Sequence, residues 1–116
     1  MEIDEILAYA LSLPNSEEAT PFGPDTVVVK HHQKIFLVLN LSKEPLSINY
    51  KANPEDIITQ RENHSAFIIP GYHMNKKHWN TFILNRQTPA TFVQNLIKTS
   101  YTLVSKPSKR SNKNQK

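Results

Sequence analysis

Residues 26–41 read TVVVKHHQKIFLVLNL, and this stretch sets the fold class of the chain. Thr26 to Lys30 is rich in β-branched residues, and Lys34 to Leu41 is apolar at successive positions near its centre. Both patterns predict strands, because such side chains pack well on a pleated surface. The short turn His31 to Gln33 separates them, so we expect the two strands to pair antiparallel.

The next segment extends this pair into a meander. Apolar and polar side chains alternate from Leu46 to Tyr50, which predicts a third strand with one face in the core. The polar positions Ser47, Asn49 and Lys51 are expected to face solvent. Before the meander, residues 15–25 contain two prolines and a glycine, which predicts an ordered surface loop. Phe22 is expected to anchor that loop in the core.

Three helices are predicted around these strands. Residues 2–13 show apolar side chains at helical spacing, and Pro14 ends the helix. Asn53-Pro54 is a typical helix start for residues 53–63, and Thr88-Pro89 repeats the pattern before a helix that reaches about Val104. Residues 66–69 and 78–85 are predicted to be two further strands.

The predicted order is therefore α-β-β-β-α-β-β-α. Each helix has one apolar stripe, so we expect an α+β two-layer sandwich with the helices on one face of an antiparallel five-stranded sheet. The length fits a single domain, residues 1–104, followed by a disordered basic tail at residues 105–116.

Charge is distributed unevenly along the chain. Residues 1–62 hold five Lys or Arg and all ten acids, whereas the rest holds nine Lys or Arg and no acid. A field of one sign attracts polyanions such as nucleic acid. Five of these nine cations follow Val104, so the basic tail predicts either enhanced solubility or a non-specific affinity for nucleic acid.

Composition excludes several classes of protein. There is no cysteine, which excludes disulfides and thiolate metal sites and suits a reducing compartment. No apolar run approaches the roughly 18–20 residues of a membrane span, and the acidic start Met1–Glu5 is unlike a signal peptide. We expect a cytoplasmic monomer without a membrane partner.

Residues 70–80, PGYHMNKKHWN, are the candidate functional segment. Lysine neutralises phosphate, aromatic rings stack on unpaired bases, and amides bond phosphates or base edges. The candidate nucleic-acid-binding residues are Tyr72, His73, Asn75, Lys76, Lys77, His78, Trp79 and Asn80. Alternatively, Tyr72 and Trp79 are core anchors, the asparagines fix the turn and the lysines are only solvated.

Several separated motifs resemble the MmcQ/YjbR-like family of small bacterial proteins. They include Leu11-Ser-Leu-Pro14, Pro21-Phe-Gly-Pro-Asp25, Lys34-Ile-Phe36, Asn53-Pro-Glu55, Pro70-Gly-Tyr-His73 with Asn75-Lys-Lys-His-Trp-Asn80, and Ser100-Tyr101 with Val104. The resemblance implies an α+β fold comparable with CyaY-like and secretion-chaperone-like proteins. It also implies a suggested "double-wing" DNA-binding arrangement. In one departure, Gln33 stands where this family commonly has glycine.

Metal binding and catalysis are weakly supported by the residues. The histidine pairs His31–His32 and His73–His78 lie on separate turns, and no carboxylate follows Glu62 to complete a site. No nucleophile with an oxyanion donor set and no phosphate-binding glycine loop is present. We therefore expect no metal, no cofactor and no enzymatic activity.

Two functions stay open. The first is weak, non-specific DNA binding through residues 72–80, helped by the basic tail. The second is a protein- or small-ligand-binding adaptor that receives its partner on the exposed sheet face around Ser47, Asn49 and Lys51. Tyr101 lies on the apolar stripe of the last helix and is expected to pack there, with its hydroxyl bonded to a polar group.

Overall fold

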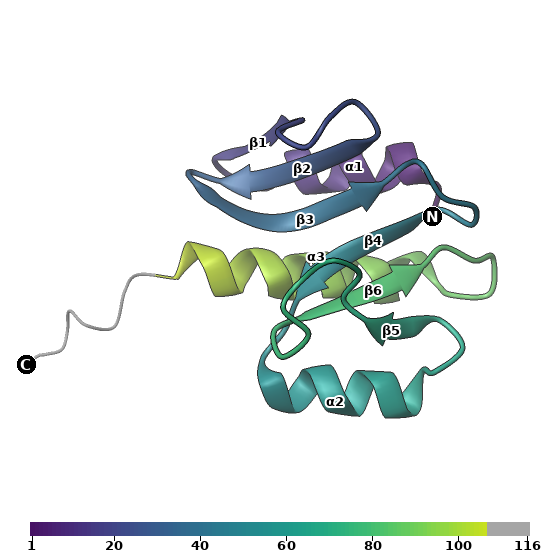
Figure 1. The fold of residues 1–116 in the computed structure, drawn as a ribbon. Helices are drawn as coiled ribbons and strands as arrows, with labels where there is room; N and C mark the ends of the chain where they lie inside the picture. Colours follow the sequence, from purple (N-terminus) through teal and green to yellow (C-terminus); the bar gives the residue numbers. More distant parts are fainter. Residues whose placement is uncertain (107–116) are drawn as a thin grey trace, which may run out of the picture.

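A computed structural model describes residues 1–106 and shows an α+β fold of three helices and six strands in this range (Figure 1). The helices are α1 (Ile3–Leu11), α2 (Pro54–Asn63) and α3 (Ala90–Ser105). The strands are β1 (Ser16–Ala19), β2 (Thr26–His31), β3 (Lys34–Asn40), β4 (Ser47–Lys51), β5 (Ile68–Pro70) and β6 (Trp79–Ile83). The predicted tail falls mostly on residues 107–116, which lie outside the described residues.

All strands belong to one antiparallel sheet with the order β1-β2-β3-β4-β6-β5. The predicted meander is confirmed, and the sheet has six strands rather than five because Ser16–Ala19 pairs with Val28–His31. The pairing of β2 with β3 shifts register between Val29 and Lys30. The tight turn that follows places His32 at a φ of 56°, so this turn adopts a left-handed conformation without a glycine.

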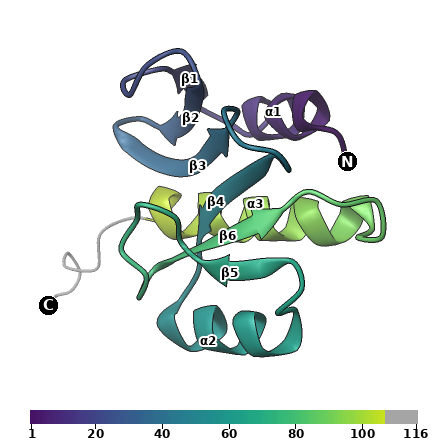
Figure 2. The same cartoon turned by 45° about the vertical axis from the view of Figure 1, so that its right-hand side comes forward.

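Helices α1 and α3 cover one face of the sheet, as predicted, whereas α2 contacts β5 and β6. Figure 1 shows α1 and α3 behind the sheet, and Figures 1 and 2 both show α2 running beside β5 at the edge of the sheet. Side chains of α1 and α3 meet those of β2, β3, β4, β5 and β6 in one apolar core that includes Ile6, Phe36, Ile48, Phe82 and Ile97. Burial of this continuous apolar surface is the main force that holds the two layers together.

Polar anchors fix α3 against this core. The buried Ser100 hydroxyl donates to the Phe36 carbonyl over 2.6 Å and accepts the Lys51 N–H over 2.8 Å. The Tyr101 hydroxyl donates to the Pro14 carbonyl over 2.7 Å, and its ring packs edge-on against Phe36. The predicted packing of Tyr101, with its hydroxyl bonded, is confirmed.

Helix starts differ from one another. Asn53 occupies the N-cap position of α2 with Pro54 next, as predicted. The start of α3 was wrongly predicted by one residue, because Pro89 itself is the N-cap. The hydroxyl of Thr88 instead donates to Asn85 Oδ1 over 2.8 Å and closes the preceding turn.

None of the helices in residues 1–106 is long and apolar enough to cross a membrane.

Candidate ligand pocket on the helix-free face

The β5–β6 loop, residues 71–78, folds back over the sheet face that carries no helix. In Figure 1 this loop crosses in front of β4 and β6, on the side opposite α3. The Gly71 N–H donates to the Trp79 carbonyl over 3.1 Å, and the Trp79 N–H donates to the Asn75 carbonyl over 3.0 Å. The loop is therefore a series of tight turns. It is bonded at Gly71 and at Asn75 to the backbone of Trp79, the first residue of β6.

Gly71 allows the loop to lie this close to β6. A Cβ atom at this position would stand 2.8 Å from the Cβ of Trp79 and 2.9 Å from its carbonyl oxygen. Both distances are shorter than van der Waals contact. Any other residue at position 71 would displace the start of the loop from the sheet.

A polar network under the loop attaches it to the sheet. Asn49 Nδ2 donates to the Tyr72 carbonyl over 3.0 Å, and the Tyr72 N–H donates to Thr81 Oγ1 over 2.9 Å. The Thr81 hydroxyl donates to Asn49 Oδ1 over 2.7 Å, and Asn40 Nδ2 donates both to that oxygen and to Ser47 Oγ. Each donor and acceptor named here therefore has a partner when the loop excludes water.

This arrangement corrects the prediction that Ser47 and Asn49 face solvent. Their exposed fractions are 7% and 2%, because the loop and the neighbouring strands cover them. Of the three predicted wet positions, only Lys51 is partly exposed. The face predicted as an open surface is therefore a covered one.

An apolar cluster lies beside the polar network. Val28, Val38 and Trp79 form a small core with Met74 from the loop packed against it. Trp79 has an exposed fraction of 9%. Its ring thus stabilises the loop rather than offering a free face to a base, as in the core-anchor interpretation.

The other predicted site residues divide into two groups. Asn80 is fully buried and bonds to α2, so it cannot reach a nucleic acid. The exposed residues of the segment are Tyr72, His73, Asn75, Lys76 and Lys77, and His78 is half-buried. Asn75 Oδ1 accepts the Lys77 N–H over 2.9 Å, so this asparagine fixes the turn.

Arg61 links α2 to the far end of the loop and was missed in the sequence. Its Nε donates to Asn80 Oδ1 over 2.7 Å, and its Nη2 donates to the carbonyl of Lys76.

Tyr50 of β4 also bonds to α2, because its hydroxyl donates to Gln60 Oε1 over 2.7 Å. Burial raises the pKa of Tyr50 well above its usual range, against smaller opposing effects of the Asn80 side chain and the Arg61 charge.

The loop and the β3–β4 connection enclose a pocket of about 350 Å³. Apolar, amide, hydroxyl and cationic side chains all contribute to its walls. The lining residues are Phe22, Thr26, Val38, Asn40, Ser42, Lys43, Asn49, Tyr72, His73 and Met74. We call this the sheet-face pocket. Of the predicted nucleic-acid-binding residues only Tyr72 and His73 lie in it, and of the predicted partner-binding face only Asn49 does. The pocket depends on contacts distant in sequence.

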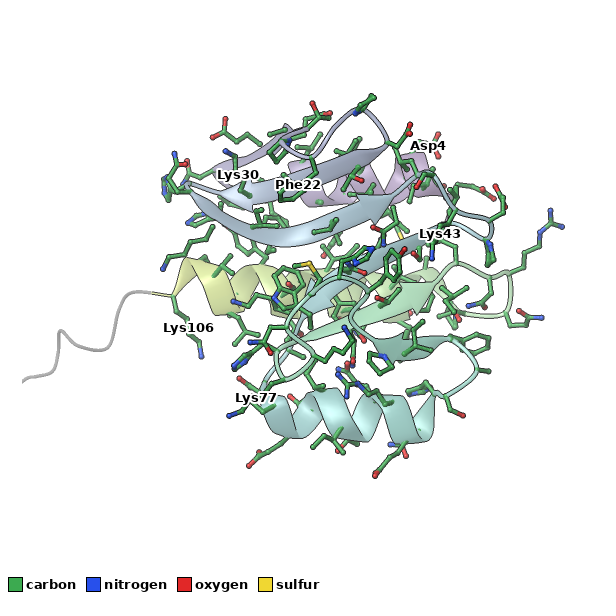
Figure 3. All side chains as sticks on the ribbon, in the orientation of Figure 1. Asp4, Phe22, Lys30, Lys43, Lys77 and Lys106 are labelled. Carbon is green, nitrogen blue, oxygen red and sulfur yellow. The ribbon has the colours of Figure 1, made fainter. Side chains whose placement is uncertain are left out.

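Two lining residues stand out at its mouth. Phe22, predicted to be buried, has an exposed fraction of 67%. It lies in the turn after β1, where Gly23 adopts a φ of 106°. Lys43 Nζ lies 3.7 Å from the centroid of the Tyr72 ring. Figure 3 labels Phe22 and Lys43 on the near side of the sheet, with Lys77 farther away toward α2.

Other candidate sites have less varied chemistry. A more open depression of about 450 Å³ lies at the other end of the sheet, between β3 and α3, with Trp79 and Lys51 in its wall. Within residues 1–106 no group of three or more His, Cys, Asp or Glu side chains is placed to hold a metal ion. His31 and His32 contact each other, and His31 also contacts Tyr101.

Sequence comparison places this architecture in a family. The YjbR family model matches residues 11–103. The chain belongs to the YjbR family. The family resemblance noted in the sequence is thus confirmed, and the matched region includes every residue of the sheet-face pocket.

Relatives of this YjbR-family chain occur in several bacteria. The chain is 36% identical over 95 residues to Uncharacterized protein YbdF of Escherichia coli O157:H7, covering 82% of this chain and 77% of the relative. It is 27% identical over 101 residues to Uncharacterized protein YjbR of Escherichia coli strain K12, covering 87% and 85%. These names assign no activity to the relatives.

Crystal structures share the fold. Protein DR2400 of Deinococcus radiodurans, described with the family-model domain DUF419, superposes with a TM-score of 0.82 at 33% identity, covering 90% of this chain and 78% of that one. A protein from Pseudomonas syringae superposes with a TM-score of 0.76 at 27% identity, covering 90% and 99%. The α+β architecture is therefore shared by experimentally determined structures.

Proposed function

We propose that this YjbR-family protein is a non-catalytic binding protein that takes a small organic ligand in the sheet-face pocket. The observation that carries the proposal is the way the β5–β6 loop covers the sheet: it leaves a pocket of about 350 Å³ beside a fully bonded polar network. Ligand sites in proteins are concave, largely preformed and start at about 300 Å³. The pocket has the volume and preorganisation of such a site.

The lining supports a ligand with both apolar and polar parts. Val38 and Met74 supply apolar surface from the strand and the loop, and Thr26 and Ser42 supply hydroxyls at the pocket wall. Polar groups of this kind fix orientation, while apolar contacts supply most of the affinity. Side chains of Asn49 and Thr81 in the sheet bond to the backbone of Tyr72 and hold the loop in place, so binding does not require the loop to fold first.

A titration with the neutral fluorescent probe N-phenyl-1-naphthylamine tests this proposal. The full chain should bind the probe with saturable fluorescence enhancement. Thr26→Phe, which fills the pocket from its wall, should weaken binding about tenfold or more, because the added ring occupies the ligand volume. The matched control Thr91→Phe, at an exposed position of α3, should bind as the wild type does. Equal binding by all three proteins would contradict the proposal.

A second candidate is weak, non-specific DNA binding through the β5–β6 loop. Lys76 and Lys77 favour it, because both side chains are exposed while Arg61 and Asn75 hold the backbone around them. Phosphate neutralisation makes affinity fall steeply with salt, with a log–log slope near −0.9 per contact on duplex DNA. Tyr72 adds little as a stacking platform, since Lys43 and His73 already lie against its ring.

Fluorescence anisotropy with a labelled duplex and a labelled single strand, at two salt concentrations, tests this candidate. Lys76→Ala/Lys77→Ala in the full chain should reduce both affinity and salt slope, as about two phosphate contacts are lost. Lys34→Ala/Lys98→Ala removes the same charge from exposed positions outside the loop. Equal losses in the two double variants would leave only a general charge effect and would contradict a site on the loop.

A further inference from the structure

We infer that the sheet-face pocket selects an organic anion with a flat apolar body, in which Lys43 binds the anionic group and Phe22 covers the body. This inference rests on the proposed function, since it names the ligand class of the same pocket. It adds two residues that lie outside the candidate segment 70–80, and both have exposed side chains.

The charge of the lining favours an anion. Lys43 and His73 reach the pocket, and no Asp or Glu is among its lining residues. Asp25 and Glu44 are the nearest acids in sequence; both are exposed and neither contributes to the wall. A cationic ligand would therefore meet a lysine and no carboxylate, whereas an anionic ligand would meet a lysine without a competing acid.

Lys43 is held at the pocket mouth by a contact that an anion can replace. Its Nζ lies 3.7 Å from the centroid of the Tyr72 ring, a cation–π contact at an exposed position. Hydrogen bonds between an ammonium and a carboxylate, phosphate or sulfonate are charge-assisted and stronger than exposed cation–π contacts. The ammonium is therefore positioned next to the pocket and has three N–H donors for an incoming anion.

Phe22 accounts for the flat apolar body. It is the most exposed large apolar side chain in residues 1–106, with an exposed fraction of 67%, and it lies at the rim of this pocket. Val38 and Met74 form the apolar wall of the same pocket. A planar group between these surfaces would cover the exposed ring and gain apolar contact on both sides.

Two probes with one skeleton separate the anion from the apolar body. 8-Anilinonaphthalene-1-sulfonate carries a sulfonate, and N-phenyl-1-naphthylamine has the same two ring systems without it. The sulfonate probe should bind the full chain more tightly. Lys43→Gln should remove that preference, weakening the sulfonate probe about tenfold while leaving the neutral probe unchanged. Lys77→Gln, at an exposed lysine of the β5–β6 loop that lies outside the pocket, is the matched control and should change neither affinity.

Phe22→Ala tests the apolar part. It should weaken both probes by a similar factor of about five, because both lose the same ring contact. Ile58→Ala, at an exposed apolar position of α2, should have no effect. Thermal melts by circular dichroism of each variant show whether a loss of binding reflects unfolding.

The outcomes distinguish a failure of the anion inference from a failure of the proposed function. If the neutral probe binds in the pocket and Lys43→Gln affects both probes equally or neither, the anion inference is wrong and the proposed function stands. If Phe22→Ala changes neither probe, the role of Phe22 is wrong. If neither probe binds the folded wild-type chain, the proposed function fails and the anion inference fails with it.

Discussion

The two faces of the sheet are built in different ways. The helix-covered face is packed by aliphatic and aromatic side chains from α1 and α3, and its large residues, such as Phe82 and Ile97, are buried. The opposite face is covered by a single loop, held by amide and hydroxyl groups around Asn49 and Thr81, and it retains the sheet-face pocket. The helix-covered face therefore supplies most of the apolar burial that stabilises the fold. The loop-covered face buries less apolar surface and carries the candidate site.

The same substitution on the two faces should have very different effects. Phe82→Ala removes a ring with an exposed fraction of 1% from the main core and should lower the free energy of unfolding by about 3–5 kcal/mol. Phe22→Ala removes an exposed ring and should change it by less than about 0.5 kcal/mol. Urea unfolding of both variants measures this. Similar losses would show that the two faces are not distinct in packing.

Substitution of the two glycines of the chain separates the effect of a close contact from the effect of backbone conformation. Gly71→Ala places a Cβ 2.8 Å from that of Trp79, and we expect a loss of about 2 kcal/mol together with weaker probe binding, since the loop must move. Gly23→Ala meets no atom within 4 Å and suffers only from its positive φ, a cost of about 1 kcal/mol. Unfolding curves and the neutral-probe titration together measure both effects. A Gly71→Ala chain that binds normally would contradict the role assigned to the loop.

The polar attachment of the loop is tested by Thr81→Val, which keeps the volume and removes the hydroxyl. The variant loses one bond to Asn49 and one from the Tyr72 N–H, so we expect it to be destabilised by about 1–2 kcal/mol. Amide hydrogen exchange should show faster exchange at Tyr72 in particular. Thr91→Val, at an exposed helical position, is the control. Unchanged protection of Tyr72 would mean that the loop is held by other contacts.

Alkaline pH tests the network that links α2 to β4. Burial raises the pKa of Tyr50 above the value near 10 of an unfolded chain, so the folded state keeps a proton that the unfolded state loses. This contribution to stability is complete below about pH 10 and declines as pH rises above it, by at most about 1.4 kcal/mol per pH unit. Tyr50→Phe should lack this part of the decline. Parallel pH profiles for the wild type and the variant would contradict it.

Much of the helix-covered face could be predicted from the sequence, because its apolar residues recur at the spacing that places them on one buried face of each helix or strand. The strand β1 was missed, since Ser16–Ala19 is polar and lacks the alternation of a half-buried strand. The burial of Asn49 could not be predicted from its own strand. It depends on a loop more than 20 residues away that folds over it.

The candidate site was predicted only in part, for the same reason. The unusual composition of residues 70–80 drew attention to the right loop, and Tyr72 and His73 do lie in the pocket. Trp79 and Asn80 proved to be structural, and the pocket residues Phe22 and Lys43 come from two other connections of the sheet. A pocket assembled from separate turns leaves no spacing pattern in the sequence.

The most direct test of the two-face account is a titration of the ¹⁵N-labelled chain with 8-anilinonaphthalene-1-sulfonate, followed by amide chemical shifts. The account predicts shifts at Lys43, Tyr72, His73 and Met74 around the sheet-face pocket, with the amides of α1 and α3 unaffected. Shifts spread over both faces, or confined to the helices, would contradict the claim that the loop-covered face holds the binding site.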